Sequence, residues 1–240
     1  MHKCQSIADG VNAVLKIYHI DPPDWELTEG ELCDWLRIGD RTIPFFWWRT
    51  DTQVAQMISL APPRKLCSMK LNRTCTKREG LARLLYRELD VAEAMFGARV
   101  AKVMCYRREN SLIMLATMDN ERVAIFELAA VLHDDTADQG RHSYWGEDGM
   151  ASDRVVSQKV ASDAVYLFTD EQDKPETYND IFLYTYGLSR TDATKAAAIA
   201  ELLMGWRKPE DWNERDAHYR RCIEAAWRSA ESGERVEVTR

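Results

Sequence analysis

Residues 77–132 determine the expected fold, and they read KREGLARLLYRELDVAEAMFGARVAKVMCYRRENSLIMLATMDNERVAIFELAAVL. The first part predicts an amphipathic helix over residues 77–96, because apolar side chains recur every three or four positions, and Gly97 can form a left-handed C-terminal cap. The second part predicts strands at 101–106, 111–118 and 122–132. Since residues 119–120, Asp-Asn, supply a tight turn, the last two strands should form an antiparallel hairpin.

The segment that follows the hairpin continues the same pattern. Its strand-like stretches and helical stretches predict four strands, two helices and a final short strand. In chain order these are residues 142–145, 154–160, 164–169 and 181–186 for the strands, 191–205 and 212–232 for the helices, and 235–238 for the last strand.

The N-terminal segment is less regular. Residues 1–17 predict a helix, and capping-box patterns at Thr28 and Thr50 predict two more, the first ending at Gly39. Residues 42–49, TIPFFWWR, predict an aromatic strand.

The expected fold class is therefore α+β: an open, mainly antiparallel β-sheet with helices packed on one face, preceded by a short helical N-terminal section. We place the division between a helical and irregular N-terminal section with an aromatic strand, residues 1–70, and an α+β domain, residues 71–240.

Composition excludes several classes of protein. The chain has 240 residues, 45% of them hydrophobic, and a net charge of −7, which does not favour a general binder of nucleic acids or membrane surfaces. The N-terminus lacks a clear signal peptide, and no segment is apolar enough to span a bilayer, so we expect a cytoplasmic protein. The six cysteines form no CxxC pair and we identify no zinc-ligand spacing, which predicts free thiols and no metal site.

No glycine-rich loop of the kind that holds a dinucleotide occurs in the chain. Such a loop lies between a strand and a helix, whose N-terminal N–H groups meet the pyrophosphate. The eleven glycines are dispersed and match neither GxGxxG nor GxxxxGK. We therefore expect no cofactor to be bound by this chain alone.

Three segments resemble the C-terminal domain of the glucose–fructose oxidoreductase / inositol dehydrogenase (Gfo/Idh/MocA) family. Residues 88–97, ELDVAEAMFG, look like the helix that precedes the first strand of that domain. Residues 111–132 and 143–152, the latter SYWGEDGMAS, are similar to its hairpin and to a strand–turn that follows. Residues 223–238, IEAAWRSAESGERVEV, resemble its end. The segments occur in the family's order.

The resemblance implies both an ancestry and a mode of association. Members of the family join this domain to a Rossmann domain and oxidise or reduce a hydroxyl group of a sugar, inositol or similar polyol with NAD or NADP. One face of their sheet carries helices, and the other commonly packs against a second subunit. The implied partner is another copy bound through the sheet face, or a Rossmann-containing dehydrogenase.

The sequence departs from the family where the chemistry occurs. Residues 1–70 are too short for the usual Rossmann domain, and the Glu-Lys-Pro motif that supplies the family's catalytic lysine is missing. The family's helix carries an Asp four residues before a His, and counting back from Asp90 these positions hold Arg83 and Arg87. Because arginine stays protonated near neutral pH, neither can accept the hydroxyl proton. We expect an oxidoreductase-like pseudoenzyme without autonomous dehydrogenase activity.

Several side chains are candidates for binding or catalysis. Arg83 and Arg87 share one helical face, and with Lys70 and Arg73 they could bind a sugar acid, a phosphate or the carboxylates of a partner. Alternatively, they form a solvated helix face or pair with Glu79, Glu88 or Asp90. The aromatic residues could stack on a sugar ring or belong to a core or interface. The candidate ligand-binding aromatic residues are Trp47, Trp48 and Trp145.

Three hypotheses for the function follow. The leading one is a non-catalytic or accessory subunit in sugar or polyol metabolism. The second is a stand-alone, cofactor-independent isomerase, lyase or hydrolase acting on sugars or sugar acids, for which His142, Asp153 and Arg87 are the first catalytic candidates. The third is a regulatory module that binds anionic sugars through the arginine cluster.

Overall fold

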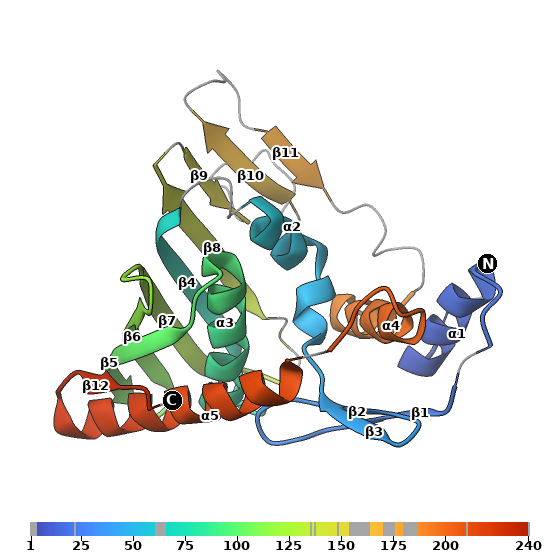
Figure 1. Ribbon diagram of the computed structural model, residues 1–240, viewed down its shortest axis with the longest axis horizontal. Coiled ribbons are helices and arrows are strands. Elements are labelled where there is room, and N and C mark those ends of the chain that lie inside the picture. The colour runs from blue at the N-terminus through green and yellow to red at the C-terminus, as the bar shows by residue number, and fades with distance from the viewer. Residues whose placement is uncertain are drawn as a thin grey trace. The chain divides into compact units, whose positions relative to one another are not determined.

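The computed structural model has five helices, twelve strands and one 3-10 turn among its described residues (Figure 1). The described residues are 4–21, 23–60, 66–134, 136, 138–147, 149–153, 164–169, 176–179, 187–209 and 211–239. The strands expected at 154–160 and 181–186 lie outside them. None of the described helices is both long and apolar enough to cross a membrane.

The chain divides into two compact units, each built from separated segments. The first contains Met1–Ala55 and Asp180–Glu214, and the second contains Gln56–Asn179 and Arg215–Arg240. The two units are defined by which residues lie close together in the fold. The division expected at residue 70 was instead placed where an irregular sequence gives way to one with regular helix and strand patterns.

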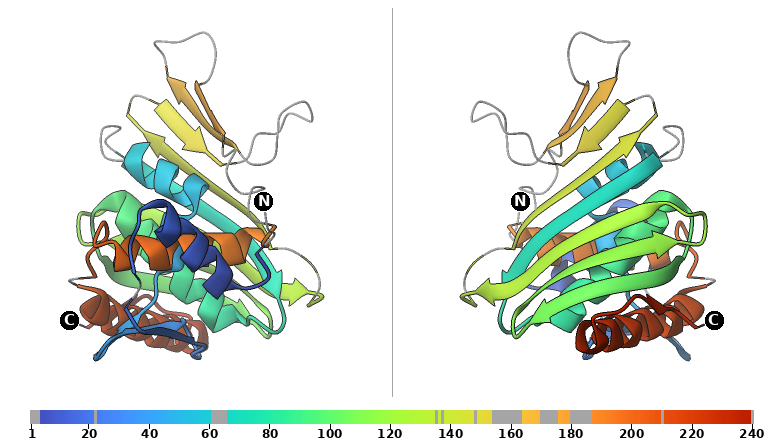
Figure 2. Two further views of the ribbon diagram at one scale, coloured as in Figure 1. Left: turned by 90° about the vertical axis from the view of Figure 1, so that its right-hand side faces the viewer. Right: turned by 90° about the vertical axis from the view of Figure 1, so that its left-hand side faces the viewer.

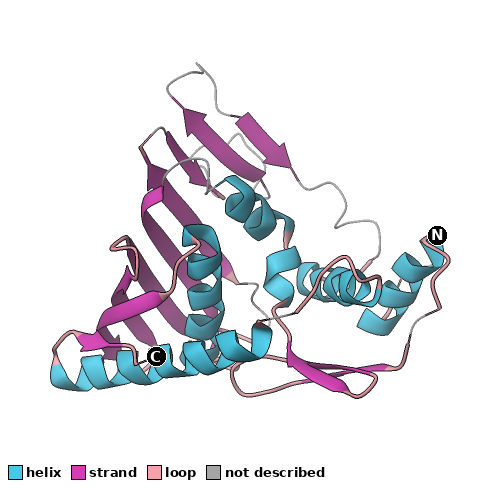
Figure 3. Ribbon diagram, viewed as in Figure 1, coloured by secondary structure: helices cyan, strands magenta, loops and turns pink. Residues whose placement is uncertain are grey.

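The second unit is built on a nine-stranded sheet with the order β11-β10-β9-β8-β4-β7-β6-β5-β12. Every neighbouring pair is antiparallel except β4 and β7, which run parallel. This confirms the expected α+β class with an open, mainly antiparallel sheet (Figure 3). The strands are β4 (Leu66–Thr76), β5 (Val100–Arg108), β6 (Ser111–Met118), β7 (Val123–Leu132), β8 (Gln139–Gly146), β9 (Gly149–Ser152), β10 (Ala164–Thr169), β11 (Glu176–Asn179) and β12 (Val236–Glu237).

Strand β4 lies in the middle of this sheet and was missed in the sequence. Its buried side chains Met69, Leu71 and Cys75 alternate with more exposed polar ones such as Lys70. This is the period of a strand with one covered face. Its basic residues, such as Lys70 and Arg73, were interpreted as part of an anion-binding site and not as part of a strand.

Helices cover one face of the sheet. Helix α3 (Leu81–Phe96) lies against it and ends at Gly97, whose φ of 60° forms the predicted left-handed cap. Helix α5 (Trp212–Ser232) runs beside β5, where the Ser229 hydroxyl accepts a hydrogen bond from the Cys105 N–H at 2.9 Å. On the opposite face, strands β4, β6 and β7 carry no described helix (Figure 2).

The first unit combines helices with a small antiparallel sheet of order β1-β2-β3. The helix expected between Thr28 and Gly39 is wrong, because the alternating segment at 35–38 pairs as a strand and Gly39, with φ of 55°, makes the following turn. The aromatic strand expected at 42–49 ends early, and the chain then makes a 3-10 turn. The elements are α1 (Ile7–Ile17), β1 (Trp25–Thr28), β2 (Trp35–Ile38), β3 (Arg41–Pro44), η1 (Trp47–Thr50) and α4 (Arg190–Leu203), with α2 (Thr52–Leu60) spanning the boundary between units.

Candidate functional site

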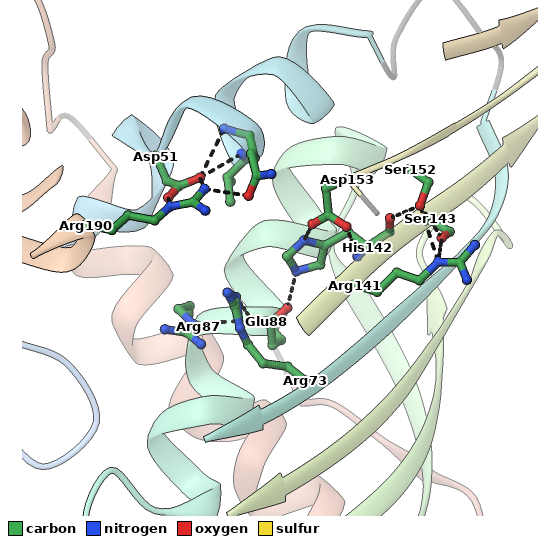
Figure 4. A network of polar contacts seen from close by, with 12 residues as sticks. Asp51, Arg73, Arg87, Glu88, Arg141, His142, Ser143, Ser152, Asp153 and Arg190 are labelled. Carbon is green, nitrogen blue, oxygen red and sulfur yellow. Dashed lines mark hydrogen bonds and ion pairs between the residues drawn. The ribbon is translucent and has the colours of Figure 1, made fainter. Parts of the chain in front are cut away.

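His142 lies between two carboxylates on the helix-covered side of the sheet (Figure 4). Its Nδ1 is 2.6 Å from Asp153 Oδ2, and its Nε2 is 2.7 Å from Glu88 Oε2. The His142 backbone N–H also donates to Asp153 Oδ1 at 2.7 Å. Strand β8 directs His142 toward α3, which supplies Glu88, while Asp153 directly follows β9. The imidazole is 2% exposed and the Glu88 side chain is fully buried.

The two carboxylates hold His142 in its charged form. Burial alone would lower the His142 pKa, but the negative charges of Asp153 and Glu88 and the hydrogen bonds to them raise it to about 9. Burial alone would raise the Glu88 pKa, but the positive charges of His142, Arg73 and Arg87 and the hydrogen bond from His142 lower it to about 2. Near neutral pH the group is therefore an imidazolium between carboxylates, and it cannot act as a proton acceptor.

Arg87 continues this chain of charges. Its guanidinium lies 3.3 Å from Glu88 Oε1, 3.5 Å from Glu79 Oε1 and 3.0 Å from Asp138 Oδ2. Burial would lower the Arg87 pKa, but the three carboxylates together raise it. An anionic ligand would have to displace one of these carboxylates, so the contacts favour the ion-pair alternative considered for Arg87.

The structure brings together only part of the expected ligand site. Arg73 on β4 contacts Glu88 Oε1 at 3.5 Å and so joins the His142 group. Arg83 lies on α3, the helix that carries Glu88, and is half-buried. Lys70 points to the other face of the sheet, where its ammonium lies 2.8 Å from Glu127 Oε1. Trp145 also lies on that face and is 40% exposed.

Trp47 and Trp48 belong to the other compact unit. Their rings meet edge to face at 5.8 Å, and Trp48 is buried. The Lys195 ammonium lies 5.4 Å from the centroid of the Trp47 ring. Both tryptophans therefore take part in packing within the first unit, and Trp47 also has a cation–π partner there.

Glu88 was expected only as a possible ion-pair partner of Arg83 or Arg87 and not as a partner of His142, and Asp138 was not expected in the site. Glu88 carried a usable signal, since it lies between Leu84 and Leu89 on the apolar stripe of α3, where a charged residue requires a buried partner. Asp138 carried no such signal, because it stands in a polar loop far along the chain from Arg87.

The uncovered side of the sheet exposes large apolar side chains. We call it the open sheet face, defined by Tyr106, Ile113, Leu115, Val131 and Trp145, which are 39–62% exposed. Strand register places Tyr106 opposite Ile113, and the alternating burial of β6 and β7 assigns Leu115 and Val131 to the same side.

The open sheet face also contains a shallow hollow of about 600 Å³. Its lining contains apolar side chains such as Tyr106 and Ile113 together with polar and charged ones, which are Asn72, Thr74, Arg107, Arg108, Ser111 and Glu127. The Asn72 amide donates to Glu127 at 3.0 Å, so this carboxylate already has partners within the chain.

Comparison with known proteins identifies the fold. No protein-family model and no curated protein matches the sequence. An oxidoreductase from Agrobacterium radiobacter, solved with NAD+, L-tartaric acid and magnesium, matches 98% of this chain and 70% of its own, with 11% identity and a TM-score of 0.64. An oxidoreductase domain protein from Kribbella flavida matches 81% of this chain with 13% identity and a TM-score of 0.58. A levoglucosan dehydrogenase, solved with NADH and L-sorbose, matches 82% with 12% identity and a TM-score of 0.59.

The match does not extend over the whole of these proteins. The chain spans 65% of the length of the Kribbella flavida protein and of the levoglucosan dehydrogenase. At this level of identity the likeness concerns the fold, and it confirms the architecture that the resemblance implied. The chain shares the fold of these oxidoreductases over most of its own length.

Proposed function

We propose that this chain is a non-catalytic, accessory subunit of a sugar or polyol oxidoreductase system, and that it associates through its open sheet face with a second copy of itself. The observation that carries the proposal is the cluster of exposed apolar side chains on that face. Exposed apolar area of this kind is typical of protein–protein contact surfaces.

The electrostatics of the His142 group support a non-catalytic role. A general base must be able to lose its proton near the working pH and must reach a substrate. His142 keeps its proton up to about pH 9 and is 2% exposed, and the adjacent Arg87 is 8% exposed and paired with three carboxylates. These groups link α3 to the sheet and offer no proton acceptor to a ligand.

The composition of the open sheet face suits a contact between two copies. Lys70 and Glu127, the charged pair near its centre, already neutralise one another within one chain, so a second copy would not bury an unpaired charge there. In a symmetric dimer the same patch meets itself, and apolar side chains such as Ile113 and Leu115 would then cover each other.

The absence of a glycine-rich loop from the sequence supports the accessory role as well. The Agrobacterium protein of the same fold was solved with NAD+, but its chain is longer than the part matched here. We expect a fluorescence titration of this chain with NADH to show no saturable binding. Saturable binding to a single chain would contradict the accessory role.

The association is tested by measuring molar mass with size-exclusion chromatography and multi-angle light scattering. We expect a dimer at tens of micromolar, and Ile113→Glu should convert it to a monomer by placing two carboxylates in an apolar contact. Ile17→Glu is the matched control, because Ile17 is 62% exposed at the end of α1 in the first unit and belongs to a different element, while Ile113 is 56% exposed.

Two outcomes would contradict the association of two copies through the open sheet face. One is a wild-type chain that stays monomeric over the whole concentration range. The other is a dimer that tolerates Ile113→Glu as well as it tolerates Ile17→Glu. If the wild-type chain is monomeric alone but forms a stable complex with a full-length dehydrogenase of this fold, the accessory role stands and the second copy is replaced by that partner.

A further inference from the structure

Helices α3 and α5 meet through a row of buried polar contacts. The Tyr86 hydroxyl donates to Asp216 Oδ1 at 2.7 Å, and the Tyr219 hydroxyl donates to Asp90 Oδ1 at 2.9 Å. The third contact differs in kind, since it joins a carboxylate, an imidazole and a thiol. It consists of Glu93 on α3 together with His218 and Cys222 on α5.

These three side chains converge at one point inside the second unit. His218 Nε2 lies 2.7 Å from Glu93 Oε1 and 3.4 Å from Cys222 Sγ, and the three potential ligand atoms all lie within 4.8 Å of one another. The side chains of His218 and Glu93 are 7% and 1% exposed, and Cys222 is fully buried. His218 and Cys222 are four residues apart, which places both on one face of α5.

The second oxygen of Glu93 is not satisfied by the protein. Oε1 accepts hydrogen bonds from the Val100 N–H at 2.8 Å and from His218, but Oε2 is buried without a hydrogen-bond partner. Arg215 Nη1 forms a long ion pair with Glu93 Oε2 at 4.0 Å, which is beyond hydrogen-bonding distance. A buried carboxylate oxygen in this state costs free energy unless another group binds it.

We propose that Glu93, His218 and Cys222 form a site for a divalent transition metal, with Zn²⁺ as the ion that fits best. One oxygen, one imidazole nitrogen and one sulfur are a ligand set suited to zinc and not to magnesium or calcium, which take oxygen ligands. In a tetrahedral zinc site, bonds of about 2.0 Å to nitrogen and 2.3 Å to sulfur place those two atoms about 3.5 Å apart. The separation of His218 Nε2 and Cys222 Sγ agrees with this spacing.

Metal binding requires one small rearrangement. The 2.7 Å contact between Glu93 Oε1 and His218 Nε2 is a hydrogen bond, shorter than the separation of about 3.3 Å between two ligands of one zinc ion. Turning the Glu93 carboxylate brings the unsatisfied Oε2 to the metal and leaves Oε1 with the Val100 N–H. The bound ion would then cross-link α3 to α5 and stabilise the helical layer behind the sheet.

This proposal departs from the sequence interpretation, which expected no metal site. The spacing His218-x-x-x-Cys222 on a helix presents two ligands on one face and was overlooked. The third ligand, Glu93, lies 125 residues earlier in the chain, so only the fold brings it to the site. The rival interpretation is a hydrogen-bonded Glu93–His218 pair with Cys222 as an uninvolved neighbour.

The experiment uses the full chain, unfolded and refolded with Co²⁺ or Zn²⁺ because burial would slow the entry of metal into the folded protein. After gel filtration in metal-free buffer, metal content is measured by mass spectrometry and the Co²⁺ form by absorption spectroscopy. We expect one metal ion per chain and a thiolate-to-cobalt charge-transfer band. Cys222→Ser should abolish that band and reduce the retained metal at least about tenfold.

Cys105→Ser is the matched control, because Cys105 is another buried thiol of the same unit and lies outside the cluster. It should keep both the metal and the band. A wild-type protein that retains no more metal than Cys222→Ser would overturn the proposal. X-ray absorption at the cobalt edge of the wild-type protein gives a readout that needs no variant, and a first shell without sulfur would overturn it as well.

Discussion

Replacing Asp153 by asparagine should reduce the dependence of folding stability on pH between about pH 6 and pH 8. Burial alone would lower the His142 pKa, but the charges of Asp153 and Glu88 and the hydrogen bonds raise it from 6.5 to about 9. A histidine whose pKa is higher in the folded state stabilises the fold below its unfolded pKa of 6.5. That contribution is lost as the pH rises through the folded value.

The size of the effect follows from the same two pKa values. Since a tenfold change in proton affinity is worth about 1.4 kcal/mol, the full contribution of His142 at low pH is about 3 kcal/mol. About 2 kcal/mol of it is lost between about pH 6 and pH 8. The lowered pKa of Glu88 arises in part from the same attraction to His142. Its free energy is therefore not added to the His142 contribution. Glu88 governs the acid side, where its contribution is present above pH 4.5 and lost as the pH falls toward 2.

Urea unfolding at one protein concentration across this pH range measures the effect. Asp153→Asn removes one of the two charges that raise the His142 pKa, so its stability should fall less between pH 6 and pH 8 than that of the wild type. The window ends at about pH 8 because burial also raises the pKa of the Cys75 and Cys105 thiols, and unfolded thiols begin to ionise above it.

Asp9→Asn is the control, because Asp9 caps α1 through hydrogen bonds with Gln5 and Ser6, neither of which is a histidine. Its pH dependence in this window should run parallel to that of the wild type. Equal slopes for Asp153→Asn and the wild type, or a wild-type stability that rises from pH 6 to pH 8, would refute the assignment of a raised pKa to His142.

Two further predictions concern packing and charge. Arg87→Met should lower the free energy of unfolding by about 3–5 kcal/mol, because it leaves Glu79, Glu88 and Asp138 without the cation that they share. Arg83→Met, on the half-buried side of α3, should lower the free energy of unfolding by less. Urea unfolding of both variants measures the difference. Gly10→Ala should lower the thermal midpoint, although alanine favours helices. The new Cβ would lie 2.8 Å from Ala196 Cβ and 2.9 Å from Leu188 Cδ1, and this overpacking should cost about 1–3 kcal/mol of folding stability. The control Asn12→Ala, on the exposed side of α1, should be neutral or stabilising.

The sequence predicted best those elements whose pattern is local. The hairpin at 111–132 and the helix ending at Gly97 followed from alternation and from a capping glycine, and both are present. The segment at 28–39 was misread because a capping-box pattern also occurs outside helices, and the strand pairing that decides its structure is not visible in the pattern. Strand β4 was missed although its alternation was visible, because its basic residues were interpreted by charge and not by period.

The candidate site was predictable to a smaller extent. His142 and Asp153 could be expected to meet, since they flank one tight strand–turn–strand segment. The contact of Glu88 with His142 depends on how α3 is rotated about its axis against the sheet. The contact of Asp138 with Arg87 depends on the path of the loop that carries Asp138. Neither is encoded in local spacing, so the sequence indicated the charged residues of the site without indicating that they neutralise one another.

The buried charges of α3 fix how this helix sits between the sheet and α5. Three of its acids have three different partners: Glu88 meets His142 on the sheet, while Asp90 and Glu93 meet Tyr219 and His218 on α5. A buried ion pair adds little stability over well-packed apolar residues, but removing one partner from such a pair costs about 3–5 kcal/mol. A rotation of α3 by one residue, about 100° around its axis, would separate all three acids from these partners at once. An apolar helix face of the same area would resist that rotation much less. The acids on α3 therefore specify one arrangement of the helical layer. The groups that resemble an acid–base site hold α3 in this arrangement.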